Sequence, residues 1–210
     1  MNAHVTFVLD SSGSMSAIRE DTIGGFNTFL ADQRNEEGTA TVSLVDFNST
    51  VNITYRGTAI EGAPELSKDS YTPGGQTALY DAFATAIEDT ASFIDGIDPA
   101  NRPETVVVVI LTDGKENASE TPQDVIREQI ETRQQECEWE FLFIGANQDA
   151  ALAADSMGID ADRSLNMAHS GKGARAAYDS TSQRISDARS TGTVSDFTDE
   201  DRLRQDEADR

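Results

Sequence analysis

VTFVLDSSGS, residues 5–14, joins a short apolar run to a polar turn. Apolar runs of this length without alternation are typical of strands that are buried on both faces of a sheet. The turn that follows carries one carboxylate, Asp10, and two hydroxyls, Ser12 and Ser14, at alternate positions. Ligands bind at the carboxyl ends of the strands in open α/β sheets, so these three side chains are candidate ligands.

The chain is strongly acidic. Of its 210 residues, enough for one domain with a full core, 38 are Asp or Glu and 16 are Lys or Arg, giving a net charge of −22. Nucleic acid and anionic membranes both require a basic patch, so we expect neither as a partner. Only three of the basic residues are lysines, a balance that resembles the proteins of salt-accumulating halophiles. A cation-scavenging surface in an ordinary cell is the alternative explanation.

The single cysteine, Cys137, excludes an intrachain disulfide and a zinc site built from cysteines. No apolar run in the sequence approaches the length that spans a membrane. The N-terminal residues show neither the basic region nor the apolar segment of an export signal. We therefore expect a cytoplasmic protein, and the sequence does not indicate its oligomeric state.

Hydrophobic spacing predicts strands that alternate with helices, the pattern of an α/β doubly wound fold. The short turn between the second and third strands predicts an antiparallel hairpin, with the third strand at the sheet edge. The predicted strands are 5–9, 41–47, 51–55, 106–111, 139–144 and 164–167. The predicted helices are 18–30, 77–94, one that starts at 121, 148–157 and 171–190.

Glycines and charges carry two further expectations. Gly24 and Gly25 interrupt the first helix at a cost of about 1 kcal/mol each, so we expect close packing there, against the sheet. From Gly192 onward, seven acids and three arginines accompany few apolar residues, which predicts a disordered segment. We therefore expect one domain over residues 1–191 and an acidic, disordered tail over 192–210.

Two further polar segments are candidates for the same sheet edge. Gly74-Gly75-Gln76-Thr77 leads into a predicted helix, and Thr112-Asp113-Gly114 follows the apolar strand at 106–111. Separately, each segment has a simpler interpretation, the first as a helix N-cap and the second as a plain turn. The turn at 10–14 is likewise built of residues that favour turns. The three segments together, each after the expected element, favour a shared site.

Asp-x-Ser-x-Ser at residues 10–14, read with Thr77 and Asp113, resembles the metal-ion-dependent adhesion site of von Willebrand factor A domains. The resemblance covers residues 4 to about 190. It implies a Rossmann-like fold with a mostly parallel, six-stranded sheet and helices on both faces. It also implies the strand order 3-2-1-4-5-6 with strand three antiparallel, which places strands one and four side by side at the switch point.

In the family that the chain resembles, two serines and one threonine bind Mg²⁺ or Mn²⁺ directly. The resemblance therefore implies that Ser12, Ser14 and Thr77 are ligands. It implies that Asp10 and Asp113 act through bound water or hydrogen bonds to the ligating hydroxyls. A hard cation prefers such oxygen ligands, and three neutral hydroxyls neutralise little of its charge. One coordination position then stays free for an acidic side chain of a partner.

The implied function is a metal-dependent protein-interaction module that binds an Asp or Glu carboxylate of an unidentified partner. The alternative is a Mg²⁺-dependent hydrolase or phosphoryl-transfer enzyme on a similar scaffold. The sequence has no Gly-x-Ser-x-Gly elbow and no phosphate-binding loop with lysine, which argues against that alternative. We expect no enzymatic activity.

Four polar residues near the predicted site have structural interpretations that we favour. Asp81 is expected to interact with the dipole of its helix, with the outer shell of the metal as the alternative. Glu116 and Asn117 are expected in an exposed loop. His169 is expected at the surface rather than in a catalytic role.

The acidic composition makes one prediction about stability. Self-repulsion among the charges is screened by concentrated salt and grows on dilution. We expect the unfolding midpoint to fall steadily as KCl is lowered from molar concentration to low salt. Thermal unfolding over a KCl series measures this directly. A flat profile would contradict the halophile interpretation.

Overall fold

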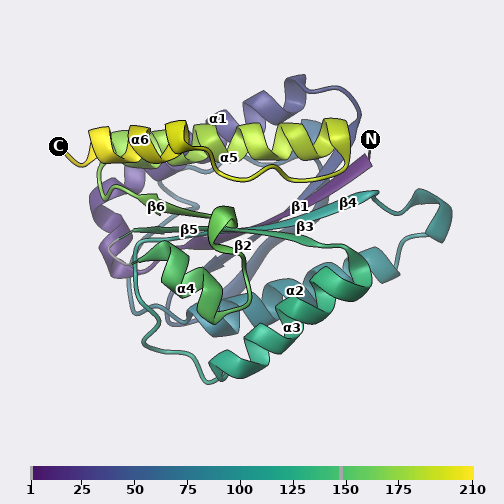
Figure 1. The fold of residues 1–210 in the computed structure, drawn as a ribbon, viewed down its shortest axis with the longest axis horizontal. Coiled ribbons are helices and arrows are strands. Elements are labelled where there is room, and N and C mark those ends of the chain that lie inside the picture. Colours follow the sequence, from purple (N-terminus) through teal and green to yellow (C-terminus); the bar gives the residue numbers. More distant parts are fainter. Residues whose placement is uncertain (1, 147–148) are drawn as a thin grey trace.

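The computed structural model describes residues 2–146 and 149–210, which form one six-stranded sheet between two layers of helices (Figure 1). The strand order is β3-β2-β1-β4-β5-β6; β3 runs antiparallel to β2, and the other neighbours are parallel. The predicted order and the antiparallel edge strand are both confirmed. The strands are β1 (Asn2–Asp10), β2 (Thr39–Phe47), β3 (Val51–Ala59), β4 (Thr105–Thr112), β5 (Glu140–Ala146) and β6 (Ser164–Met167).

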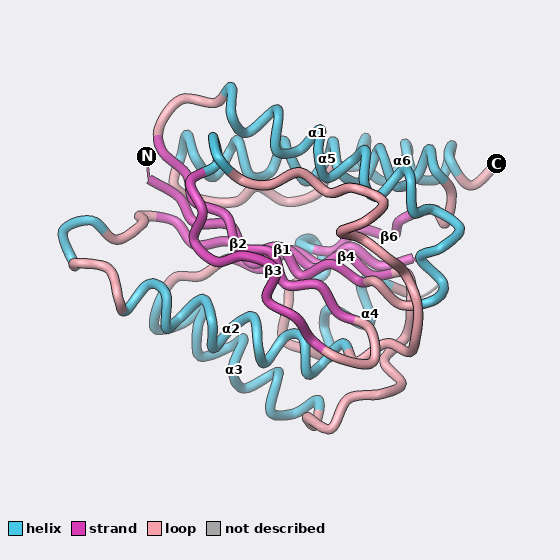
Figure 2. Tube along the Cα trace, turned by 180° about the vertical axis from the view of Figure 1, so that it is seen from behind, coloured by secondary structure: helices cyan, strands magenta, loops and turns pink. Residues whose placement is uncertain are grey.

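Within the described residues, three helices cover each face of the sheet, as the two layers in Figures 1 and 2 show. One layer holds α1 (Arg19–Asn35), α5 (Gly171–Thr191) and α6 (Asp199–Ala208). The other holds α2 (Leu79–Asp95), α3 (Gln123–Cys137) and α4 (Ala150–Ser156). The start of the fourth helix, predicted at Gln148, lies outside the described residues. Short 3₁₀ helices span Gly13–Ile18, Ile60–Gly62, Pro99–Asn101 and Ala161–Arg163. None of the helices described is long and apolar enough to cross a membrane.

β1 contributes to both layers of the core. Phe7 packs in the cluster that contains α1 and α5, whereas Val8 packs in the cluster that contains α2 and α3. Successive side chains of a strand point to opposite faces, so a strand covered by helices on both sides must be apolar at nearly every position. Every residue of β4 is buried for the same reason. The two apolar runs of the sequence therefore become neighbouring central strands.

A polar cluster lies within the β1–α2 layer of this core. His4 is fully buried, and its ring nitrogens lie 2.8 Å from Thr41 Oγ1 and 3.1 Å from Thr6 Oγ1. Thr6 Oγ1 in turn lies 2.6 Å from Thr90 Oγ1 of α2. Burial lowers the pKa of His4 to about 4, so its imidazole is neutral at neutral pH. His4 therefore stabilises the fold and lies in the core, away from the sheet edge.

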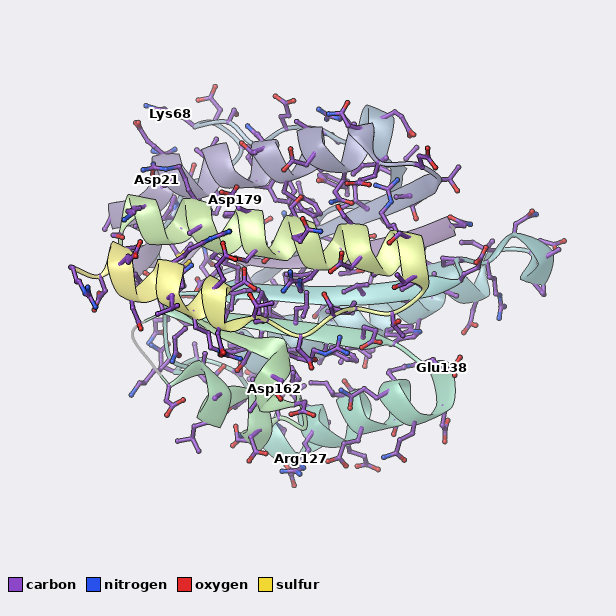
Figure 3. All side chains as sticks on the ribbon, turned by 45° about the horizontal axis from the view of Figure 1, so that its top comes forward. Asp21, Lys68, Arg127, Glu138, Asp162 and Asp179 are labelled. Atoms are coloured by element: carbon purple, nitrogen blue, oxygen red, sulfur yellow. The ribbon has the colours of Figure 1, made fainter. Side chains whose placement is uncertain are left out.

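The outer surface is acidic, as the composition predicts. Figure 3 shows Asp179 on α5, Glu138 at the end of α3 and Asp162 near β6, all of them exposed. The few basic side chains pair with some of these acids: Lys68 with Glu20, for example. Exposed pairs of this kind contribute little to stability, because water and salt screen them.

In the described part of the chain, four acidic side chains are buried. Two of them belong to ion pairs: Arg56 Nε donates to Asp89 Oδ2 at 3.0 Å, and Arg184 Nη1 donates to Asp201 Oδ2 at 2.9 Å. The other two, Asp10 and Asp113, follow or end the central strands β1 and β4. Burying a carboxylate is costly, so each such residue requires a structural or functional explanation.

The prediction of a disordered tail is wrong. Residues 199–208 form α6, whose N-terminus has a capping box in which the side chains of Thr198 and Asp201 bond each other's backbone N–H groups. Val194 and Phe197 join the core beneath α5. Ser180 Oγ also donates to Asp201 Oδ1, at 2.7 Å. The acid-rich composition indicated disorder, but composition does not reveal that Asp201 pairs with the buried Arg184 of α5.

The two glycines of α1 differ sharply in their surroundings. A Cβ at Gly25 would lie 2.2 Å from Cδ2 of Tyr178, a fully buried residue of α5. A Cβ at Gly24 would have no neighbour within 4 Å. Close packing is confirmed at Gly25 alone, and its partner is α5 and not the sheet. Gly25 lets the two helices approach each other closely, and Gly24 has no such role.

This difference predicts opposite effects of the same substitution. Gly25→Ala should lower the free energy of unfolding by about 1–3 kcal/mol, because the added methyl group would overlap the ring of the buried Tyr178. Gly24→Ala should raise it by up to about 1 kcal/mol, because alanine favours the helix. Denaturant unfolding at constant salt compares the two variants. Equal effects would contradict the helix contact.

Candidate metal site

Three segments meet at the carboxyl ends of β1 and β4. Backbone hydrogen bonds join the first two: Gly13 N donates to Gly75 O at 3.1 Å, and Gly74 N donates to Ser11 O at 2.8 Å. Gly75 has φ +79°, a left-handed conformation that glycine adopts without strain. The segments at 10–14 and 74–77, far apart in sequence, therefore form one framework.

Asp10 is fully buried. Its carboxylate accepts hydrogen bonds from Ser12 N at 2.6 Å and from Thr112 Oγ1 at 2.5 Å. Its backbone carbonyl accepts a hydrogen bond from the Tyr71 hydroxyl. Burial raises the pKa of Asp10, an effect that nearby Asp113 adds to and the hydrogen bonds oppose. The folded state thus disfavours the negative charge that the carboxylate carries at neutral pH.

Ser14 connects the first segment to the third. Ser14 Oγ donates to Asp113 Oδ1 at 2.5 Å, and Ser12 Oγ lies 3.2 Å from Ser14 Oγ. Ser14 and Asp113 are 99 residues apart in sequence. The structure therefore brings together both predicted serines and both predicted aspartates, because Asp10 ends β1 and Asp113 follows β4, the strand beside it.

Thr77 is not a helix N-cap. α2 begins at Leu79, its N-cap position is Ala78, and no side chain caps that end. Thr77 is buried, and its hydroxyl lies so close to Gly114 that a Cβ there would be 2.7 Å from Thr77 Oγ1. The simpler interpretation of Thr77 is therefore wrong. Its side chain packs on the segment that follows β4, next to Asp113.

Asn117 and Glu116 fix the Thr77 segment, a role that the exposed-loop prediction missed. Thr77 N donates to Asn117 Oδ1 at 2.9 Å, and Asn117 N donates to Thr77 O at 3.1 Å. Glu116 accepts from Tyr80 N at 3.1 Å and from Ser119 N at 2.7 Å. Burial would raise the pKa of Glu116, but these hydrogen bonds outweigh it and the pKa is lowered.

Asp81 holds a neighbouring loop in place. Its two carboxylate oxygens accept from Glu120 N at 3.1 Å and from Thr121 N at 2.9 Å. These bonds outweigh burial and lower the pKa of Asp81. Its carboxylate binds the backbone that leads into α3, so the structure favours a structural role over the outer shell of a metal.

His169 belongs to the site, contrary to the prediction of a surface residue. Its Nε2 lies 2.8 Å from Asp113 Oδ2, and its side chain is 27% exposed. His169 lies between β6 and α5, and β6 is the edge strand that runs parallel to β5. The signal in the sequence was that His169 follows a predicted strand, where ligands are expected. That strand has only four residues and is weakly marked in the sequence, so the signal was easily missed.

The donor set of the site is unusual for a metal centre. Within residues 2–146 and 149–210, no group of three or more His, Cys, Asp or Glu side chains is placed to hold a metal ion. A cation at this edge would instead meet the hydroxyls of Ser12, Ser14 and Thr77, with Asp10 and Asp113 beside them. Oxygen donors of this kind suit hard cations such as Mg²⁺ and Mn²⁺.

Residues 4–197 match the family model of the von Willebrand factor type A domain, and the chain belongs to that family. Domains of this family mediate protein–protein interactions and are in general not enzymes. A search of curated protein sequences found no match.

Solved structures share the fold at low sequence identity. Proximal thread matrix protein 1 from the mussel byssus is 18% identical, with a TM-score of 0.61 over 88% of this chain and 46% of that chain. A second structure of the mussel protein has zinc in its metal-ion-dependent adhesion site (MIDAS) motif. It has 16% identity and a TM-score of 0.60 over 85% of this chain and 46% of that one. A von Willebrand factor type A protein from Catenulispora acidiphila is 17% identical, with a TM-score of 0.57 over 87% and 42%. The present chain thus spans less than half of these proteins.

Proposed function

We propose that this chain is a metal-dependent protein-interaction module. A Mg²⁺ or Mn²⁺ ion would be held by the hydroxyls of Ser12, Ser14 and Thr77, with Asp10 and Asp113 in its outer shell. The ion would bind an Asp or Glu carboxylate of a protein partner. The observation that carries this proposal is the hydrogen bond of 2.5 Å from Ser14 Oγ to Asp113 Oδ1, which joins the ends of the two central strands.

The electrostatics of the site support a cation. Two carboxylates, Asp10 and Asp113, are buried within interaction distance of each other, and burial raises the pKa of Asp10. A divalent cation would offset this repulsion and stabilise both ionised forms. The mussel protein, whose MIDAS motif is occupied by zinc, supports a divalent ion at a site of this type.

The arrangement of hydrogen bonds supports hydroxyls as the direct ligands of the metal and the two aspartates as outer-shell residues. Asp10 accepts from Thr112 Oγ1, and Asp113 accepts from Ser14 Oγ, so both carboxylates are engaged by neutral hydroxyls. A serine that donates its proton to a carboxylate keeps a lone pair for a cation. The metal would then have mainly neutral ligands, remain electron-poor and attract a partner's carboxylate.

The acidity of the whole chain bears on which partners can approach. With a net charge of −22, the surface repels acidic proteins at long range, and salt screens this repulsion. We propose that the surface is adapted to concentrated salt. Recognition of an acidic side chain would then depend on the local charge of the bound metal.

The first prediction from the proposed function concerns the effect of metal on thermal stability. Mg²⁺ or Mn²⁺ at a hundredfold excess over its Kd should raise the melting temperature of EDTA-treated protein by about 5–10 °C at constant ionic strength. Ser14→Ala should remove most of this shift, because the hydroxyl ligand is lost. Ser16→Ala is the matched control, since Ser16 is an exposed serine two residues farther along the chain. An unchanged melting temperature in wild type would contradict the site.

The second prediction separates metal binding from partner binding. Asp10→Asn should weaken Mn²⁺ binding by about 10–100-fold, because an outer-shell carboxylate is lost. Thr77→Ala should weaken the binding of acetate or an acidic peptide to the Mn²⁺-loaded protein. This loss of binding free energy should be much larger than the loss of unfolding free energy. Thr77→Ser keeps the hydroxyl and should restore binding. Calorimetric titration of Mn²⁺, then of the carboxylate, measures both steps. Wild-type carboxylate binding by Thr77→Ala would contradict the ligand role.

A further inference from the structure

The carboxylate of Asp113 is held from two sides. Ser14 Oγ donates to Oδ1 at 2.5 Å, and His169 Nε2 lies 2.8 Å from Oδ2. An ionised carboxylate has no proton to donate, so the imidazole Nε2 is the donor of the second bond. The two bonds together fix the rotation of the carboxylate about its Cβ–Cγ bond. The carboxylate plane, in turn, fixes the direction of the Ser14 hydroxyl.

The loop that carries His169 is attached to helix α6 on both sides of the histidine. Gln205 Oε1 accepts from Ala168 N at 3.0 Å, and Ser170 Oγ donates to Ala208 O at 3.1 Å. Gln205 Nε2 also donates to Gly173 O at 3.2 Å, within the first turn of α5. Both chain neighbours of His169 therefore bond to α6, and the C-terminal end of α6 lies at the same edge of the sheet as the site (Figure 1).

Helix α6 is itself firmly anchored. Arg184 Nη1 of α5 donates to Asp201 Oδ2 at 2.9 Å, and the two side chains are 8% and 6% exposed. Breaking a buried ion pair by removing one partner is strongly destabilising. Gln205 is also buried, which protects its hydrogen bonds from competition with water. A set of buried and half-buried contacts thus runs from α5 through α6 to the loop at 168–170.

We propose that His169 is a positioning residue for the metal site, and that helix α6 holds His169 in place. This inference rests on the proposed function, because it assigns His169 a role toward the cation that Ser12, Ser14 and Thr77 would bind. A partner in the outer shell orients a ligand and raises the affinity for the metal without touching it. His169 acts in this way through Asp113 and Ser14. Helix α6 holds the loop that carries His169 in a fixed position.

The test of His169 uses Mn²⁺ alone as the probe, with free Mn²⁺ followed by electron paramagnetic resonance. His169→Leu keeps much of the volume but removes the donor, and it should weaken Mn²⁺ binding about 10–100-fold. His169→Gln supplies an amide Nε2 donor and should restore the affinity to within about threefold of wild type. Melting temperatures in EDTA should be equal to within about 2 °C, since the side chain is partly exposed.

The results separate positioning from a structural role. Loss in His169→Leu with recovery in His169→Gln, at equal stability in EDTA, supports the proposal. Wild-type affinity in His169→Leu would overturn it. An equal loss in both variants would also overturn it, because the donor would then not be what matters. If wild-type protein itself binds no Mn²⁺, the proposed function fails, and this outcome is distinct from the other two.

The test of α6 uses Gln205. Gln205→Leu removes the bonds to Ala168 and Gly173 and should weaken Mn²⁺ binding in the same direction as His169→Leu. In the double variant with His169→Leu, Gln205→Leu should weaken Mn²⁺ binding no further, because Gln205 affects the metal site only through His169. Leu203→Ala is the matched control, since Leu203 is 59% exposed on the same helix. Additive losses, or a silent Gln205→Leu, would overturn the part assigned to α6.

Discussion

The parallel pairing of β1 with β4 is the constraint on which the site depends. The register that pairs Leu9 with Leu111 puts Asp10 beside Thr112, whose hydroxyl donates to the Asp10 carboxylate at 2.5 Å. Both strands are buried along nearly their whole length between the two layers of helices, and burial of this kind specifies the register. A slip by one residue would turn Asp10 to the opposite face of the sheet. The core thus fixes the geometry of the site.

The energetic cost of the site is electrostatic. Where Asp89 and Asp201 are buried, an arginine accompanies each. Asp10 is instead buried near a second carboxylate, Asp113, and its own carboxylate accepts from the Ser12 N–H and the Thr112 hydroxyl. Such an arrangement costs stability unless a positive charge is supplied. The proposed cation would supply it. In this view, the hydrogen bonds from Thr112, Ser14 and His169 orient the carboxylates in advance, so that little rearrangement accompanies binding.

The sequence predicted those features that depend on one strand and the turn after it. The convergence of Ser12, Ser14 and Asp113 was expected from apolar runs that end in polar residues, and the strand order was implied by the resemblance to von Willebrand factor A domains. The structure confirms both. Contacts between distant helices could not be predicted in the same way. α6 depends on a buried pair between Asp201 and Arg184, which an acid-rich composition conceals. His169 follows a strand of only four residues and meets a carboxylate 56 residues away.

The central claim is that a divalent cation binds through hydroxyls at the carboxyl ends of β1 and β4. Anomalous diffraction from crystals grown with Mn²⁺ tests it most directly, because the signal locates the ion without reference to any side chain. The account predicts one strong peak within about 2–2.5 Å of the hydroxyl oxygens of Ser12, Ser14 and Thr77, with the carboxylates of Asp10 and Asp113 farther away. A peak bonded mainly to the carboxylates, or no peak at this edge of the sheet, would contradict it.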